Sequence, residues 1–504
     1  MDLIFFNGRV VTMDQNNPLA EAVAIEGSQI ASVGSDRDIL ALKEGHTDVI
    51  DLKGRTLLPG FNDSHMHLLV YALNRAKVDL RFCESIEDVI EKIRLFISEN
   101  GVVPGEWVLG WGWDQGRFQE KKMPDRHDLD RASTEHQLVM TRTCCHVLSA
   151  NSAALEKAGL EKQSPGNIAG GNVEVDAAGT PTGVLEEKAM QLLTNVLPPF
   201  DTDALKDLIK TAAGDFIAAG LTSVQTDELA ALDYEYLPIL FDAYHGLEAD
   251  GELPLRVNLQ LLLPDRDKLQ DLLDQGYRTG QGSNYFKIGP LKLLTDGSIG
   301  GRTAYLGEPY LDSPETHGIA VLSYKEIEEL VEMAYRNQMQ VAAHAIGDAA
   351  ITMLLDIYRD VSARHQRSDP RFRIVHASLT NQAIVERFAK QDILADIQPA
   401  FIASDYEVIE QCLGSERAAW AYPWKSFFDK GIKMGCGTDC PVEHYDPLEN
   451  IITAVTRQDK EGNPPGGWHP EQRLILDQVL QLYTAGSAYC SYEENIKGTV
   501  TSGK

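Results

Sequence analysis

The sequence predicts an α/β protein whose main domain is a distorted (β/α)8 barrel of the TIM type, and two observations carry this prediction. Eight apolar segments have the length and composition of buried strands, and helical segments such as YKEIEELVEMAYRNQ separate several of them. The predicted strands cover residues 61–69, 221–226, 255–263, 286–297, 339–347, 372–378, 393–400 and 432–439. Eight strands that alternate with helices are typical of a barrel enclosed by its helices.

Two segments do not follow this alternation. Residues 1–58 consist of short strands and turns, so we expect a small β-sandwich domain that also includes residues 485–504. Residues 59–484 form the barrel domain. Within it, residues 70–203 are too many for a structureless loop in a compact domain, which predicts an inserted subdomain after the first barrel strand.

Composition limits the classes of partner. The chain of 504 residues has a net charge of −29 and a pI near 4.8, which argues against nucleic acid because phosphate binding needs clustered Lys and Arg. It contains no secretory signal and no run of about 18 apolar residues, so we expect no membrane contact. Seven scattered cysteines fit a reducing cytoplasm. A small-molecule substrate is the expected partner.

Polar side chains stand at the ends of five predicted strands. His65 and His67 are two residues apart, so both imidazoles leave the same face of the first strand. The later strands end with Lys292 and Asp296, with His344, with His376 and with Asp439. Catalytic groups of a barrel gather at the carboxyl ends of its strands, and imidazole with carboxylate suits zinc, iron or manganese. The pattern therefore indicates a metal site.

This ordered set of motifs resembles the amidohydrolase superfamily: HxH after LLPGFND, then a Lys, two single His and a terminal Asp. The finer motifs GWGWDQ, GTPTGVLEE, GLTSVQTDE, KLLTDGSIGGRTAYLGEPY, HAIGD and GTDCPVEHYDPL resemble its amidohydrolase-3 branch, the group of YtcJ-like proteins and N-substituted formamide deformylases. The resemblance covers nearly the whole chain, and its specificity lies in the order of the motifs.

The resemblance implies one or two divalent metal ions, zinc in the first place, with manganese or iron as alternatives. Carried over by position, His65 and His67 hold one ion with Asp439 beside it, whereas His344 and His376 hold the second. Such an ion activates water and polarises a substrate carbonyl. Asp439 is the expected catalytic group, which accepts a proton from the water and returns it to the departing nitrogen.

The resemblance also implies that Lys292 bridges the two ions. A cationic ammonium beside two dications is disfavoured by repulsion, so we expect carbon dioxide to convert Lys292 into an anionic carbamate. The alternative is an ordinary lysine paired with Asp296, which lies four residues further along the strand and on the same face.

Candidate substrate contacts lie in the insertion and in the strand-end loops. They are Trp111, Trp113, Asp114, His146, Asp296 and Arg302. The tryptophans close over the metals or form the core of the insertion, and both readings stay open. Arg302 follows a Gly-rich loop, where it clamps a carbonyl or carboxylate of the substrate or stays solvated at the surface.

The sequence thus predicts a metal-dependent hydrolase of a non-peptide carbon–nitrogen bond in an amide, N-formyl or N-acyl compound. A deaminase of the same superfamily is one alternative, although His344 is followed by AIGDAAI without the Glu that such deaminases carry. A non-catalytic binding barrel is another, although such relatives usually lose metal ligands. We expect a homodimer, for the sole reason that dimers are the commonest homo-oligomers.

The last residues, NIKGTVTSGK, end before the hydrophobic strands with which the resembling proteins usually continue. We therefore expect the small domain to have exposed sheet edges. Every predicted metal ligand precedes this point of the chain.

Overall fold

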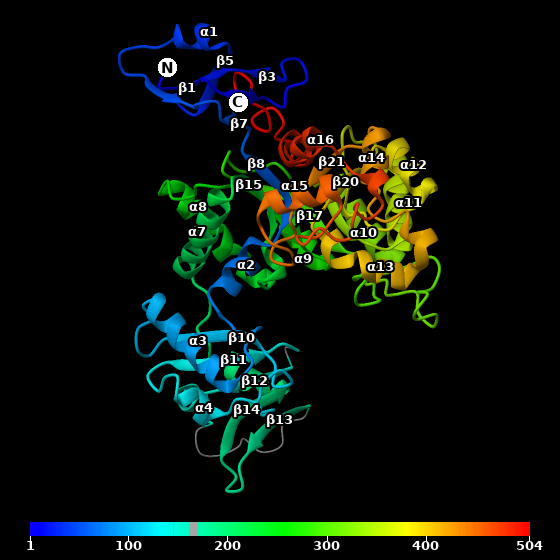
Figure 1. The fold of residues 1–504 in the computed structure, drawn as a ribbon. Helices are drawn as coiled ribbons and strands as arrows, with labels where there is room; N and C mark the ends of the chain where they lie inside the picture. The colour runs from blue at the N-terminus through cyan, green and yellow to red at the C-terminus, as the bar shows by residue number, and fades with distance from the viewer. Residues whose placement is uncertain (145, 161–169) are drawn as a thin grey trace. The chain divides into compact units, whose positions relative to one another are not determined.

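The computed structural model describes residues 1–144, 146–160 and 170–504. The chain divides into two compact units, of which the first contains residues 1–70 and 209–504 and the second contains residues 71–208. The second unit covers most of the predicted insertion, and Figure 1 shows the course of the chain through both units. Each unit is described by itself.

The first unit contains the predicted barrel. Its eight-stranded sheet has the order β21-β20-β19-β18-β17-β16-β15-β8, and neighbouring strands in this order run parallel where their register is assigned. The strands are β8 (Phe61–Met66), β15 (Leu221–Asp227), β16 (Arg256–Leu262), β17 (Phe286–Leu294), β18 (Val341–Ala345), β19 (Arg373–His376), β20 (Leu394–Ile397) and β21 (Met434–Cys436). Beyond the ends of β8 and β21, Asp439 N–H donates to the His65 carbonyl (2.9 Å) and His67 N–H to the Cys440 carbonyl (2.7 Å). These bonds bring the first and last strands together, and the predicted barrel fold is confirmed.

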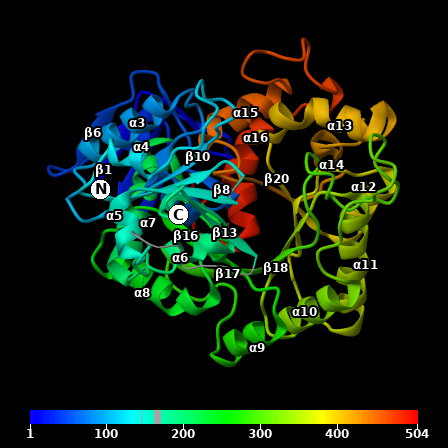
Figure 2. The same ribbon diagram turned by 90° about the horizontal axis from the view of Figure 1, so that it is seen from below.

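Helices follow most of the barrel strands. They are α7 (Thr202–Ala218), α8 (Leu237–Ala249), α9 (Arg266–Asp274), α10 (Tyr324–Arg336), α11 (Asp348–Arg364), α12 (Gln382–Gln391), α13 (Phe401–Ala418), α14 (Trp424–Asp429), α15 (Pro447–Thr456), α16 (Leu476–Gln481) and α17 (Ser487–Cys490). In α10, a capping box of Ser323 and Glu326 starts the helix, and Ile327, Leu330 and Val331 form its buried face. Figure 2 shows α10, α11 and α12 along the outer side of the barrel strands. Among the described residues, no helix is both long and apolar enough to span a bilayer.

The barrel interior contains a buried polar layer below the strand ends. The Arg373 guanidinium is fully buried and forms an ion pair with Asp396 on the neighbouring strand. The same guanidinium donates to the Gln225 Oε1 atom (2.7 Å) and to the Ser64 carbonyl (2.7 Å). Because these partners come from β8, β15 and β20, Arg373 joins strands across the barrel and fixes which side chains face its interior.

The amino-terminal part of the first unit forms two small sheets. One has the order β5-β4-β1-β6 and the other β3-β2-β7. Their strands are β1 (Leu3–Phe6), β2 (Arg9–Val11), β3 (Leu19–Ala20), β4 (Ala22–Glu26), β5 (Gln29–Gly34), β6 (Asp48–Asp51) and β7 (Thr56–Leu57). Backbone bonds link Ile30 to Gly503 (2.8 Å) and to Lys504 (2.6 Å), so the carboxyl-terminal residues partly cover the β5 edge. By contrast, Ser487 of α17 lies against the barrel, where its carbonyl accepts from Gln225 (2.7 Å).

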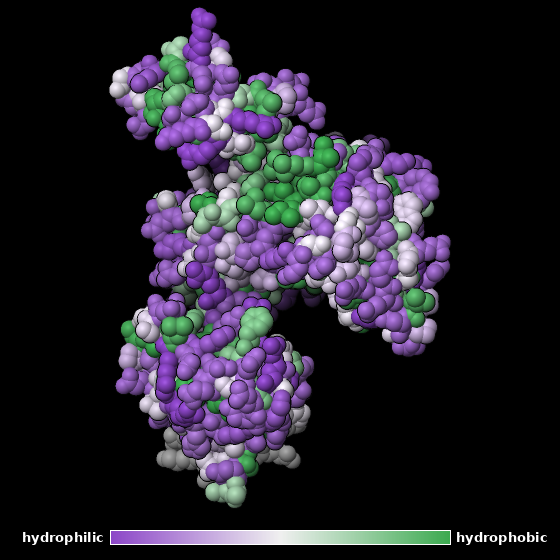
Figure 3. Space-filling model, viewed as in Figure 1, coloured by the Kyte–Doolittle hydropathy of each residue, from purple (hydrophilic) through white to green (hydrophobic). Residues whose placement is uncertain are grey.

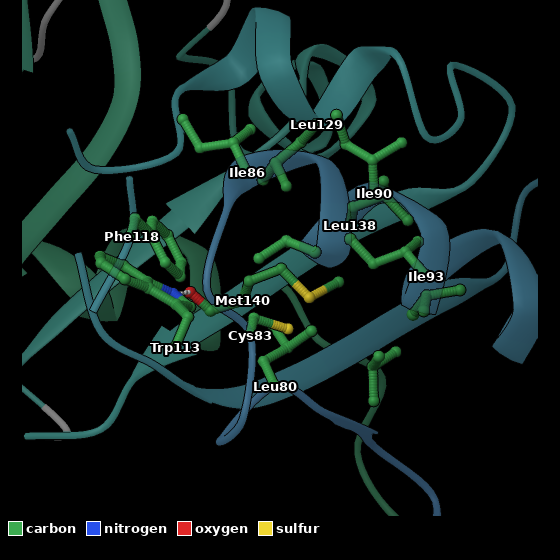
Figure 4. Close-up of a cluster of buried hydrophobic side chains, with 13 residues drawn as sticks. Leu80, Cys83, Ile86, Ile90, Ile93, Trp113, Phe118, Leu129, Leu138 and Met140 are labelled. Carbon is green, nitrogen blue, oxygen red and sulfur yellow. Dashed lines mark hydrogen bonds between the residues drawn. The ribbon is translucent and has the colours of Figure 1, made fainter. Parts of the chain in front are cut away.

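The second unit is built on a six-stranded sheet of order β13-β14-β12-β11-β10-β9. Its elements are β9 (Val78–Asp79), α3 (Ile86–Glu99), β10 (Trp107–Trp113), α4 (Arg126–Asp130), β11 (Gln137–Arg142), β12 (Val147–Ala150), α5 (Ser152–Lys157), β13 (Gly171–Val175) and β14 (Pro181–Glu187). Figure 4 shows one core of this unit, in which Ile86, Ile90 and Ile93 of α3 pack with side chains of β10 and β11. The unit therefore has a hydrophobic core of its own.

An apolar surface covers part of the first unit around α15 and α16 (Figure 3). Leu448 and Ile452 of α15, together with Ile475 and Leu476 at the start of α16, are each more than half exposed. Exposed apolar patches of this kind are typical of contact surfaces.

Candidate metal centre

The HxH pair and Asp439 meet at the point where the barrel closes. His65 and His67 leave the same face of β8 and its extension, and Asp439 follows β21. The Asp439 Oδ1 atom lies 3.3 Å from His65 Nε2 and 3.2 Å from His67 Nε2. The backbone bonds that join the two strand ends hold these three side chains in place.

The two later histidines come to the same centre. The His376 ring lies 5.9 Å from the His65 ring and 4.5 Å from the His344 ring, measured between centroids. One ligand atom from each of His65, His376 and Asp439 lies within 4.8 Å of the others. Side chains that are more than 300 residues apart in the sequence thus converge at one buried point.

Lys292 reaches this centre from β17. Its side chain is 1% exposed, and its Nζ atom lies 3.0 Å from His65 Nε2. Burial lowers the pKa of Lys292 to about 8, against the opposing effect of the Asp227 and Asp439 carboxylates. The amine is therefore easier to deprotonate than an exposed lysine, which carbamate formation requires.

Asp296 lies against His344. Its Oδ1 atom is 3.1 Å from His344 Nδ1, and its carboxylate accepts from the backbone N–H groups of Tyr305 (3.0 Å), Ile346 (3.0 Å) and Gly347 (2.7 Å). The structure thus places the carboxylate of Asp296, predicted as a substrate contact, beside His344, although His344 Nδ1 forms no hydrogen bond of acceptable geometry.

The donor set fits a divalent cation. Burial lowers the pKa of His65 to about 3 and holds that of His376 well below its usual value, so both imidazoles stay neutral, as metal ligands must be. Although burial opposes it, contact with His65 and His67 holds the pKa of Asp439 well below its usual range. The buried Asp439 Oδ1 atom nevertheless forms no hydrogen bond of acceptable geometry. Neutral imidazoles around an ionised and unsatisfied carboxylate are the ligands that zinc or manganese prefers.

Asp63 contacts the backbone next to the metal centre and was not among the predicted residues. Its carboxylate accepts from the backbone of His65 (2.9 Å) and from both the backbone (2.9 Å) and the hydroxyl (2.6 Å) of Thr438. It therefore ties the HxH strand to the loop that carries Asp439. A Cβ atom at Gly437 would lie 2.6 Å from the His65 nitrogen, so this junction requires glycine. Asp63 lies two residues before His65 and therefore on the same face of the strand, and this spacing could have indicated that it belongs to the site.

The two tryptophans of GWGWDQ belong to the second unit and differ in their surroundings. Trp113 is fully buried in the core shown in Figure 4, where its Nε1 atom donates to the Met140 carbonyl (2.8 Å). The Arg81 guanidinium lies over the Trp111 ring, 4.7 Å from its centroid. Trp113 thus contributes to the core of this unit, and Trp111 is the more accessible of the pair.

Asp114 and His146 also form pairs inside the second unit. Asp114 accepts from Arg142 (2.8 Å), and the exposed His146 Nδ1 atom lies 3.2 Å from a Glu187 oxygen. These contacts are internal to the unit, so a substrate contact by either residue stays a prediction.

Arg302 lies in the loop that follows β17. Its guanidinium pairs with Asp312 (2.5 Å) and donates to the Gly300 carbonyl (2.8 Å). The side chain therefore braces its own loop, and a role as a substrate clamp stays a prediction.

A parallel eight-stranded barrel with four histidines, a lysine and an aspartate at its strand ends defines the class of metal-dependent barrel hydrolases. Residues 48–504 match the model of the amidohydrolase family, and the chain belongs to this family. The predicted resemblance is confirmed, and the protein is an enzyme that hydrolyses carbon–nitrogen bonds.

Similar proteins cover the full chain. It is 32% identical over 507 residues to a putative amidohydrolase, YtcJ, of Bacillus subtilis, with 100% of this chain and 93% of the relative aligned. It is 29% identical over 515 residues to the N-substituted formamide deformylase of Arthrobacter pascens, with 100% and 92% aligned. A solved metal-dependent hydrolase of Pyrococcus furiosus, described as uncharacterized, superposes with a TM-score of 0.78 at 29% identity, covering 99% of this chain and 97% of that one.

Proposed function

We propose that the protein hydrolyses the carbon–nitrogen bond of a small amide, N-formyl or N-acyl compound, using one or two divalent ions. The observation that carries this proposal is the convergence of His65, His376 and Asp439 within 4.8 Å at the carboxyl ends of the barrel strands. The likeness to an N-substituted formamide deformylase supports the substrate class. Zinc is the first choice of ion because imidazole and carboxylate form its usual ligand set, and manganese or iron is the alternative.

The predicted site residues have two roles, which are to hold the divalent ions and to transfer a proton. His65, His67 and Asp439 would hold one ion, and His344 and His376 would hold the second. A divalent ion at this centre supplies a Lewis acid and lowers the pKa of a water molecule towards 7. Asp439 Oδ1 faces the two imidazoles, which leaves Oδ2 to take the proton of the attacking water and to pass it to the departing nitrogen.

The activity is tested with a panel of N-formyl, N-acyl, lactam and amino-heterocycle compounds, assayed after chelation and again after addition of Zn²⁺ or Mn²⁺. We expect turnover of at least one amide-type compound, loss of that turnover on chelation and recovery with the added ion. Release of ammonia from amino-heterocycles alone would instead identify a deaminase. Turnover that is unaffected by complete metal removal would contradict the proposal.

Lys292 is proposed to bridge the two ions as a carbamate. As an ammonium it would lie beside two dications, whereas the carbamate supplies an anion with two oxygens. With ¹³C-bicarbonate, we expect one carbamate NMR signal in the metal-loaded protein and no such signal in Lys292→Met. Lys287→Met is the matched control, since Lys287 starts the same strand but pairs with Glu493 (2.9 Å). Absence of the signal from the metal-loaded wild type would refute the bridge.

A further inference from the structure

Asp227 ends β15, one of two neighbouring barrel strands to which no site residue has been assigned. Around the barrel, β21, β8, β17, β18 and β19 carry the predicted ligands, while β15 and β16 lie between β8 and β17. Asp227 therefore ends a strand that lies between the strand of His65 and His67 and the strand of Lys292, both of which carry predicted metal ligands.

The orientation of Asp227 follows from Gln225. The Gln225 side chain points into the barrel, because its Oε1 atom accepts from Arg373 (2.7 Å), which reaches it from β19. Side chains two residues apart on a strand share a face, so the Asp227 carboxylate points into the barrel as well, one layer nearer its mouth. The Asp227 carbonyl in addition lies 3.3 Å from His67 Nδ1, which leaves His67 Nε2 for the metal.

The Asp227 carboxylate forms no well-aligned hydrogen bond. The residue is 1% exposed, and among the described residues neither of its oxygens has a hydrogen-bond partner of acceptable geometry. Burial raises the pKa of Asp227, while the charges of His67 and Lys292 and the nearby backbone N–H groups of Leu262 and Ala230 oppose this rise. A buried carboxylate without well-aligned donors is destabilising unless a cation or a better donor compensates it.

We propose that Asp227 is a further oxygen ligand of the divalent ion that His65, His67 and Asp439 hold. The inference rests on the proposed function, because it assumes that an ion binds at this centre. A dication beside His67 supplies the positive charge that the Asp227 oxygens lack, and carboxylate oxygen is a ligand that zinc and manganese accept. Strand β15 thereby joins the ring of strands that build the metal centre.

Glu228, the next residue, provides the matched control. Its carboxylate is equally buried, but it accepts from the Tyr244 hydroxyl (2.7 Å) and from the Leu69 backbone (2.8 Å). Glu228 begins the 3-10 helix Glu228–Ala230 directly after β15, and its two partners are not among the predicted metal ligands. Glu228→Gln therefore removes a buried carboxylate at the same height without removing an unsatisfied one.

The first test measures the dissociation constants of Zn²⁺ and Mn²⁺ by equilibrium dialysis against metal-free full-length protein. We expect Asp227→Asn to weaken binding by about tenfold or more, and Glu228→Gln to leave it unchanged. Wild-type affinity in Asp227→Asn would overturn this inference while leaving the proposed function intact. A wild-type protein that binds neither ion would overturn both.

A second readout is thermal unfolding with and without the ion. Without metal, Asp227→Asn should be at least as stable as the wild type, because the substitution removes a buried carboxylate that has no well-aligned hydrogen-bond donor. With Zn²⁺, the rise in its melting temperature should be smaller than that of the wild type. A variant that is destabilised without metal but shows the full rise with Zn²⁺ would assign Asp227 a structural role and refute the inference.

Discussion

Replacing Asp439 by Asn is expected to lower kcat/KM by about 10²–10⁴-fold, the range that a positioned acid–base group contributes. Asp439 is the carboxylate that contacts both His65 and His67, and these contacts lower its pKa and keep it ionised. An amide has nearly the same shape but cannot carry the proton from water to the departing nitrogen. Steady-state kinetics on the best substrate of the panel measure the effect.

Glu443→Gln is the control for this substitution. Glu443 lies four residues further along the same loop, and its carboxylate accepts from the Ser404 hydroxyl (2.7 Å). We expect this variant to keep the wild-type kcat/KM, which separates loss of the Asp439 carboxylate from a general disturbance of the loop. If Asp439→Asn had full activity at wild-type metal content, Asp439 would not be the proton carrier.

The second large effect is on stability. Arg373→Met should lower the free energy of unfolding by about 3–5 kcal/mol, the usual effect of removing one partner of a buried ion pair. The substitution leaves Asp396 fully buried without its cation, and it removes the donors to Gln225 and to the Ser64 carbonyl. Chemical denaturation of the full-length protein, followed through the unfolding of the barrel, measures the loss.

The double variant Arg373→Met/Asp396→Leu separates charge from shape. If the uncompensated Asp396 charge causes most of the loss, the double variant should regain a large part of the stability, because apolar replacements of buried ion pairs are often tolerated. An Arg373→Met protein as stable as the wild type would show that the polar layer does not hold the barrel strands together.

The sequence predicted the barrel, and the polar side chains at its strand ends, because both leave a local pattern. Each barrel strand is a short apolar segment between helical ones, and the structure contains all eight. His65 and His67 share a face by their spacing alone. His376 and Asp439 could be placed because active groups of such barrels collect at the carboxyl ends of strands.

The supporting carboxylates could not be assigned from local patterns. Asp63 and Asp227 stand in strands that are buried on both faces, where polar and apolar residues do not alternate clearly, and Asp296 follows the strand β17. Their partners are set by contacts between strands, such as the approach of Asp296 to His344 from a separate strand. The same holds for Trp113, because the sequence does not show whether a tryptophan in a motif packs in a hydrophobic core or lines a pocket. Its burial in the folded protein shows that it packs in the core.

The metal centre is tested most directly by anomalous X-ray diffraction from crystals grown with Zn²⁺. We expect an anomalous peak about 2.0–2.2 Å from imidazole nitrogens of His65 and His67 and from an Asp439 oxygen, and, where two ions bind, a second peak at the same distance from His344 and His376. Crystals that contain zinc elsewhere, with these side chains hydrogen-bonded to one another and no peak between them, would contradict the assignment of the metal centre.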